Sequence, residues 1–205
     1  SGLSSYAERV WLGDKLADAA NIPPTDARNR FMSGLPAHLL AQALNLGDIA
    51  YALDAACASS LYAIKLACDR LHDRSADMML AGAVNRADDL FLHVGFCALK
   101  ALSPSGQSRP FHKEADGLVP ANGAGMVLLK RLDDARRDGD KILGVIRAVA
   151  LSNDGRGKGF LAPSKDGQVR AMQTAYELAG LKPDDVSLLE CHATGTTVGD
   201  KTEIQ

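Results

Sequence analysis

The sequence predicts an α/β fold in which strands alternate with helices. The first observation is the apolar run from Asp77 to Val84, which is typical of a strand buried on both faces of a parallel sheet. The second is a set of further strand patterns at 126–129, 142–151 and 186–190. The third is that helix patterns lie between these strands, and this alternation points to an α/β fold.

The composition is that of an ordinary soluble globular protein. The chain has 205 residues, of which 46% are hydrophobic and 23% charged, and its formal net charge is -2. No apolar run approaches the length that spans a membrane, and the N-terminus lacks the pattern of a secretion signal. We therefore expect neither a nucleic-acid nor a membrane partner.

The cysteines favour a reducing, cytoplasmic setting. Cys57, Cys68, Cys97 and Cys191 lie far apart in the chain and lack the paired short spacings of a zinc site. The chain also contains no Asn-x-Ser/Thr sequon. We expect free thiols and no bound metal.

Two helices and a strand are predicted before Cys57. Ala7 to Ala20 has the spacing of an amphipathic helix, which Ile22-Pro23-Pro24-Thr25 would end. Leu35 to Ala41 suggests a short helix with a proline in its first turn. The apolar residues from Ile49 to Leu53 then suggest a strand.

Cys57 lies at the predicted turn between this strand and the next helix. Leu61, Ile64, Cys68 and Leu71 keep helical spacing, so the thiol of Cys57 falls at a helix N-terminus. Unpaired backbone N–H groups and the positive end of the helix dipole favour a thiolate there. A cysteine among alanines is more often a small buried hydrophobe, so its position alone leaves both interpretations open.

The remaining elements follow in order along the chain. We predict helices over 88–96, 133–137 and 165–180, the last of them closed by Gly180. The polar residues from Leu102 to Asp116 indicate an irregular loop.

His192 follows the last predicted strand and begins a turn rich in hydroxyls and glycines. Thr194 and Thr196 could hydrogen-bond an extended polar substrate arm, although a histidine at this place can equally be a satisfied structural residue. Reactive groups in α/β sheets gather beyond the carboxyl ends of strands. Cys57 and His192 could therefore share one site, although 135 residues separate them.

Two glycine-rich segments do not support a nucleotide site. Asn122 to Gly125 is followed by a strand pattern, and Gly155-x-Gly157-x-Gly159 by a loop, whereas the dinucleotide fingerprint opens a helix. We predict no permanently bound cofactor.

A series of motifs together resembles one enzyme family. In chain order they are Asp54-Ala55-Ala56-Cys57-Ala58-Ser59-Ser60-Leu61, Ser103-Pro104-Ser105-Gly106, Arg109-Pro110-Phe111, Ala115-Asp116-Gly117, Gly123-Ala124-Gly125 and His192-Ala193-Thr194-Gly195-Thr196-x-x-Gly199-Asp200. From about Leu35 onwards the chain resembles β-ketoacyl synthases, and in particular part of the ketosynthase domain of type I polyketide synthases.

The resemblance implies a thiolase-like fold, with two related α/β halves layered α-β-α-β-α, truncated here at both ends. Residues 1–205 would belong to a single ketosynthase domain, with about 1–140 mostly in the first half and about 141–205 starting the second. Such domains are expected to form homodimers. Acyl carrier protein and an acyltransferase domain are the partners that the resemblance implies.

The resemblance also implies a reaction, the decarboxylative Claisen condensation of polyketide assembly. Cys57 would take an acyl group from a carrier-protein thioester, and His192 would help to decarboxylate a malonyl-type extender. Thr194 and Thr196 match residues that hydrogen-bond the phosphopantetheine arm. A covalent acyl-cysteine divides the condensation into two manageable barriers, and N–H donors would stabilise the enolate.

The chain also departs from the family pattern. The family's downstream lysine and second catalytic histidine would lie beyond Gln205, so we expect the 205 residues alone to be inactive. His112 stands where an aspartate is common, and Asn122 where a glutamate is common.

Three alternatives remain open from the sequence. A fatty-acid-type ketosynthase would carry the same motifs. A cysteine peptidase would have a similar separation of cysteine and histidine, but the flanking Cys-Gly-Ser-Cys-Trp type of pattern is absent. A non-condensing scaffold that binds acyl carriers is the third, although scaffolds of this kind lose the reactive cysteine.

Overall fold

The computed structural model describes residues 35–47, 49–87, 90–156 and 162–205. The helix predicted at Ala7–Ala20 lies outside the described residues, as does part of the glycine-rich segment at 152–159. The elements are α3 (Leu35–Ala43), η3 (Ala56–Ala58), α4 (Ser59–His72), β1 (Met78–Asn85), α5 (Leu90–Ala98), β2 (Gly123–Lys130), α6 (Leu132–Asp138), α7 (Lys165–Ala179), η4 (Pro183–Asp185) and α8 (Thr197–Ile204).

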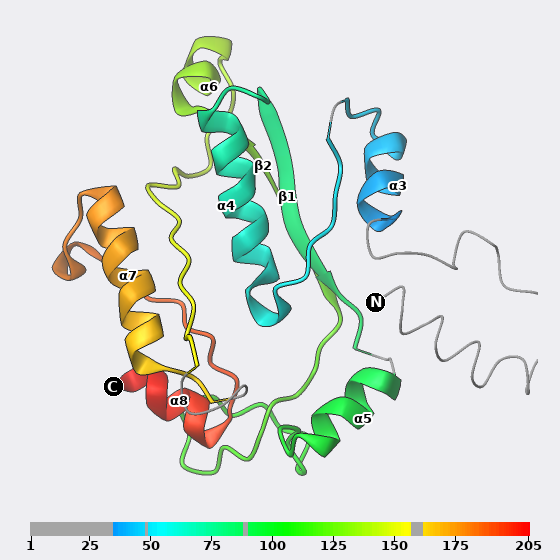
Figure 1. Cartoon of the computed structure of the whole chain (residues 1–205), viewed down its shortest axis with the longest axis vertical. Helices are drawn as coiled ribbons and strands as arrows, with labels where there is room; N and C mark the ends of the chain where they lie inside the picture. Colours follow the sequence, from blue (N-terminus) through cyan, green and yellow to red (C-terminus); the bar gives the residue numbers. More distant parts are fainter. Residues whose placement is uncertain (1–34, 48, 88–89, 157–161) are drawn as a thin grey trace, which may run out of the picture.

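Strands β1 and β2 form an antiparallel pair with α4 packed along it (Figure 1). The register runs from Met78 opposite Lys130 to Asn85 opposite Gly123. Gly82 is required where the strands approach, because a Cβ there would lie 2.0 Å from the carbonyl oxygen of Gly125.

Three of the buried apolar residues lie on α4 and β1, which pack against each other. Ala67 and Leu71 are one turn apart on α4, and both are buried, as is Ala81 on β1. The helical spacing of the sequence therefore turns one apolar stripe of α4 onto the strand pair.

Arg131, which follows β2, ties the far end of α4 to the sheet. Its guanidinium donates hydrogen bonds to the carbonyl oxygens of Leu71, at 3.1 Å, and Ala76, at 2.7 Å. It also pairs with the carboxylates of Asp77 and Asp134. The carbonyl group of Leu71, in the last turn of the helix, thereby gains a side-chain donor.

The helices predicted within the described residues are confirmed with small changes in their ends. The helix predicted at 165–180 is α7, with the Ser164 hydroxyl accepting from the N–H of Gly167 and Gly180 in the left-handed conformation at its end. The short helix at 133–137 is α6, and the helix at 88–96 begins at Leu90 among the described residues.

Among the described residues, the strand predicted at Asp77–Val84 has an antiparallel partner and not the predicted parallel one. An apolar run shows that a strand is covered, but not in which direction its partner runs. In the structure the chain returns through α5 and a long loop, and β2 pairs antiparallel to β1.

Three predicted strands, at Ile49–Leu53, Ile142–Leu151 and Val186–Glu190, are absent from the described residues. A strand needs a neighbouring backbone to complete its hydrogen-bond ladder, and these segments have no such ladder within the described ranges. Their apolar side chains are accordingly open to solvent: Leu143 is 88% exposed and Leu188 80%. None of the described helices combines the length and apolar character needed to cross a membrane.

Candidate active site

Cys57 sits on a tight elbow immediately before α4. It belongs to the one-turn helix η3, and its side chain is exposed. Ala56, the residue before it, has a φ of 49°, which is a left-handed conformation that alanine rarely adopts. The predicted turn with an accessible cysteine at its tip is therefore present, although the segment leading into it is not a paired strand.

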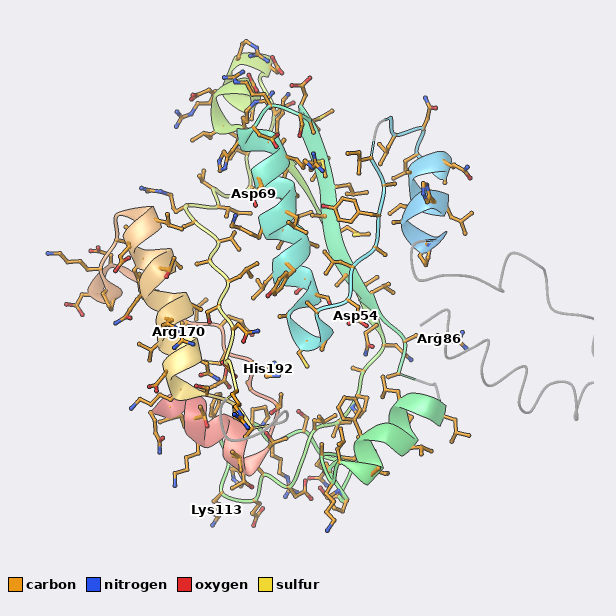
Figure 2. All side chains as sticks on the ribbon, viewed as in Figure 1. Asp54, Asp69, Arg86, Lys113, Arg170 and His192 are labelled. Atoms are coloured by element: carbon orange, nitrogen blue, oxygen red, sulfur yellow. The ribbon has the colours of Figure 1, made fainter. Side chains whose placement is uncertain are left out.

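His192 begins a turn that α8 holds in place. The Glu203 carboxylate accepts hydrogen bonds from the backbone N–H groups of His192, at 2.6 Å, and Ala193, at 2.8 Å. Ala193 has a φ of 50°, so the carboxylate supports another alanine in a strained conformation. Figure 2 shows His192 close to the N-terminal end of α4.

The thiol of Cys57 and the imidazole of His192 lie close enough to influence each other's pKa. A hydrogen bond to His192 is the main cause that lowers the pKa of Cys57, with smaller contributions from the charge of His192 and from the backbone N–H of Cys57 itself. The pKa of His192 is raised, chiefly by the hydrogen bond to Cys57 and then by the charges of Cys57, Glu203 and Asp200. Burial opposes both shifts. Both pKa shifts are in the direction of a thiolate–imidazolium pair.

Thr194 and Thr196 lie together on the turn after His192. Their hydroxyl oxygens are 2.9 Å apart and hydrogen-bonded, and both side chains are half-buried. A Cβ on Gly199 would lie 2.5 Å from the Thr196 hydroxyl oxygen and 3.3 Å from that of Thr194. Each hydroxyl has one donor and two acceptor positions, so the pair keeps capacity to bind a further polar group.

Asp200 joins this turn to the loop before β2. The side chain is buried, and its two oxygens accept from the N–H groups of Phe111, at 2.6 Å, and Gly195, at 3.0 Å. The N–H of Gly117 also donates to the carbonyl oxygen of Gly195 at 3.0 Å. The loop carrying the Arg109-Pro110-Phe111 motif is thus attached directly to the histidine turn.

Sequence reasoning assigned no role to the carboxylates of Asp200 and Glu203. Both carboxylates bind backbone N–H groups, and these carry no side-chain signature. The available signal was two acidic residues three positions apart, just after a turn rich in glycine. Among the described residues, no group of three or more His, Cys, Asp and Glu side chains is placed to hold a metal ion.

Two family models match nearly the whole chain. The model described as the N-terminal domain of β-ketoacyl synthase matches residues 2–135, and the model of its C-terminal domain matches residues 143–205. The chain belongs to the β-ketoacyl synthase family. The resemblance predicted from the motifs is confirmed.

Curated relatives of this ketosynthase chain include proteins of polyketide synthases. One protein of the phenolphthiocerol/phthiocerol polyketide synthase of Mycobacterium tuberculosis is 44% identical over 167 residues, which cover 82% of this chain and 9% of that protein. Another protein of the same synthase is 43% identical over 204 residues, covering 100% of this chain and 11% of that protein. A component of the polyunsaturated fatty acid synthase of Thraustochytrium sp. is 40% identical over 185 residues, covering 89% and 9%.

Solved ketosynthase structures share the fold. The PfaC ketosynthase–chain length factor superposes with a TM-score of 0.85 at 49% identity, covering 89% of this chain and 20% of that one. The ketosynthase from module 6 of the bacillaene synthase of Bacillus subtilis 168 gives a TM-score of 0.79 at 38% identity, covering 82% and 31%. The predicted thiolase-like fold is thereby confirmed, and the chain spans about a tenth of these curated relatives and less than a third of these solved chains.

Proposed function

We propose that the protein is a β-ketoacyl synthase of polyketide assembly, which joins an acyl group to a malonyl-type extender by decarboxylative Claisen condensation. The observation that carries this proposal is that Cys57, at the elbow before α4, and His192 come close together in a chain of the β-ketoacyl synthase family. Polyketide synthase proteins among the relatives support the polyketide assignment.

The first half-reaction is acyl transfer to Cys57. The thiolate attacks the thioester carbonyl of the acyl carrier, a carbon–sulfur bond forms, and the bond to the carrier thiol breaks. The proton held by the His192 imidazolium is available to the departing thiolate. The lowered pKa of Cys57 supports this role, because the thiolate is the nucleophile.

The second half-reaction is carbon–carbon bond formation. The malonyl-type thioester loses carbon dioxide, and the electrons of the broken bond form an enolate. The enolate carbon attacks the acyl-cysteine carbonyl, and the carbon–sulfur bond to Cys57 breaks to restore the thiolate. His192 lies beside the sulfur, where a neutral imidazole can donate to the enolate oxygen.

Substrates of this reaction would arrive on the phosphopantetheine arm of an acyl carrier protein. The paired hydroxyls of Thr194 and Thr196 fit such an arm, because they lie on the histidine turn and keep hydrogen-bonding capacity. We also infer an acyltransferase domain as a partner, a homodimeric assembly, a cytoplasmic location and a boundary between the two halves near residue 140. The two family models, which match on either side of residues 136–142, support that boundary.

Labelling of the intact protein with cerulenin or an acyl thioester tests the proposal. We expect mass spectrometry to find the adduct on Cys57, and Cys57→Ala to abolish both acylation and condensation. The Cys97→Ala variant is a matched control, since Cys97 is also an exposed free thiol. Labelling of Cys68, Cys97 or Cys191 with Cys57 unmodified would refute the assignment.

A fatty-acid-type ketosynthase is the second candidate. The 40% identity to the polyunsaturated fatty acid synthase component favours it. Both candidates use the same two half-reactions, so the product decides between them. An unreduced β-keto chain released from the intact assembly supports the polyketide assignment, and a reduced hydrocarbon chain supports the fatty-acid assignment.

A further inference from the structure

The backbone just before Cys57 is held in a conformation that its own sequence disfavours. Ala56 has a φ of 49°, and for a residue with a Cβ this conformation is disfavoured by roughly tenfold or more. Alanine has no polar side chain with which to stabilise it. Neighbouring groups must therefore supply the stabilisation.

Two side chains bind Ala56 from both sides of the residue. The N–H of Ala56 donates to the Asp54 carboxylate at 2.9 Å, and the carbonyl oxygen of Ala56 accepts from the Ser59 hydroxyl at 2.7 Å. The Ser59 oxygen also accepts from the N–H of Ala55 at 3.0 Å. Both backbone polar groups of the strained residue are thus fixed by side chains on either side of Cys57.

The direction of the Cys57 side chain depends on this elbow. Cys57 follows Ala56 directly, and a rotation of Ala56 to an ordinary negative φ would redirect the Cα–Cβ bond of the next residue. The thiol interacts with an imidazole from a distant part of the chain, so a redirected thiol would lose that partner.

We propose that Asp54 and Ser59 are positioning residues, which hold the Ala56 elbow so that the Cys57 thiol reaches His192. This inference rests on the proposed function, in which that pair performs the chemistry. Asp54 and Ser59 act through the backbone of Ala56. Figure 2 shows Asp54 and His192 near the same end of α4, with Asp54 on the approach to the elbow.

The charges around the pair make a pH profile informative. His192 is the charged group that influences Cys57, and Cys57, Glu203 and Asp200 are those that influence His192. Asp54 is not among them. An effect of Asp54 on the reactivity of Cys57 would therefore report geometry.

The experiment measures the rate of Cys57 alkylation by iodoacetamide against pH, in the intact protein, with peptide mass spectrometry. The variants are Ser59→Ala and Asp54→Ala, which remove the hydrogen bonds, and Ser59→Thr and Asp54→Asn, which keep an oxygen in place. Ser60→Ala is the matched control, because Ser60 is the neighbouring half-buried serine and its side chain makes no hydrogen bond within the described part of the chain.

We expect Ser59→Ala and Asp54→Ala to slow alkylation at neutral pH by roughly tenfold and to move the profile to higher pH, towards that of His192→Ala. Ser59→Thr, Asp54→Asn and Ser60→Ala should stay close to the wild type. Profiles of Ser59→Ala and Asp54→Ala that match the wild type, or lowered melting temperatures with unchanged profiles, would overturn the proposal.

A glycine substitution at position 56 distinguishes a loss of the elbow conformation from a general failure to fold. Glycine adopts a positive φ without penalty, so Ala56→Gly should retain the wild-type profile and should recover most of the reactivity lost in Ser59→Ala. If Ala56→Gly with Ser59→Ala folds but remains as slow as Ser59→Ala alone, the elbow is not the cause. Condensation by the wild type is assayed separately, so a failed function and a failed positioning role give different results.

Discussion

Replacement of Asp200 by alanine should strongly destabilise the protein. The buried carboxylate accepts hydrogen bonds from two backbone N–H groups, those of Phe111 and Gly195. Hydrogen bonds to a charged group each contribute about 1.5–3 kcal/mol, and the two donors would be left without a partner. We therefore expect the free energy of unfolding to fall by about 3–5 kcal/mol, which corresponds to a decrease in Tm on the order of 10 °C.

Thermal unfolding by calorimetry and urea titration would measure this effect. Asp200→Asn keeps one carbonyl oxygen but turns an NH2 group towards the second donor, so about half of the loss is expected. Asp184→Ala is the control, because Asp184 is exposed, lacks a side-chain hydrogen bond among the described residues, and should change stability by less than about 0.5 kcal/mol. A loss below about 1 kcal/mol for Asp200→Ala would show that the carboxylate does not link the loop to the histidine turn.

Two further substitutions test the site and the sheet. Glu203→Gln should lower the pKa of His192, because it removes a negative charge beside the imidazole and one of the two oxygen acceptors for backbone N–H groups. An NMR titration of His192 measures this change, and Glu190→Gln is the control because Glu190 is exposed. A His192 titration that is unchanged in Glu203→Gln would contradict the prediction. Gly82→Ala should lower the free energy of unfolding, measured by urea denaturation, by about 1–3 kcal/mol, because its Cβ would meet the opposite strand. Gly123→Ala is the control, because a Cβ there has open space and should leave the stability nearly unchanged. Equal effects of the two substitutions would contradict the close approach at Gly82.

The helices could be predicted because their signals are local. The helical spacing after Cys57 and the glycine that ends α7 both act within a few residues, and α4 and α7 lie where these signals predict them. The pairing of strands depends on backbone from distant parts of the chain. The alternating pattern at 142–151 therefore did not show that this segment lacks a hydrogen-bonded neighbouring strand among the described residues. The direction of β2 relative to β1 was not encoded in the apolar run for the same reason.

The sequence predicted the two reactive side chains of the site, but not the interactions that set their pKa values and hold their backbone in place. Sequence reasoning brought Cys57 and His192 together, and it attributed the thiolate to a helix N-terminus. In the structure the hydrogen bond from His192 is the largest influence on the pKa of Cys57. The carboxylates of Asp200 and Glu203 escaped notice because they bind backbone N–H groups. A turn without tertiary context does not reveal which of its N–H groups will need an acceptor.

The distance along the chain between Cys57 and His192 has a consequence during protein synthesis. The helix after Cys57 is local and can form soon after it leaves the ribosome, whereas His192 is translated 135 residues later. Until the imidazole arrives, the thiol lacks the largest of the influences that lower its pKa. The nucleophile is therefore fully activated only when the two distant segments have folded together.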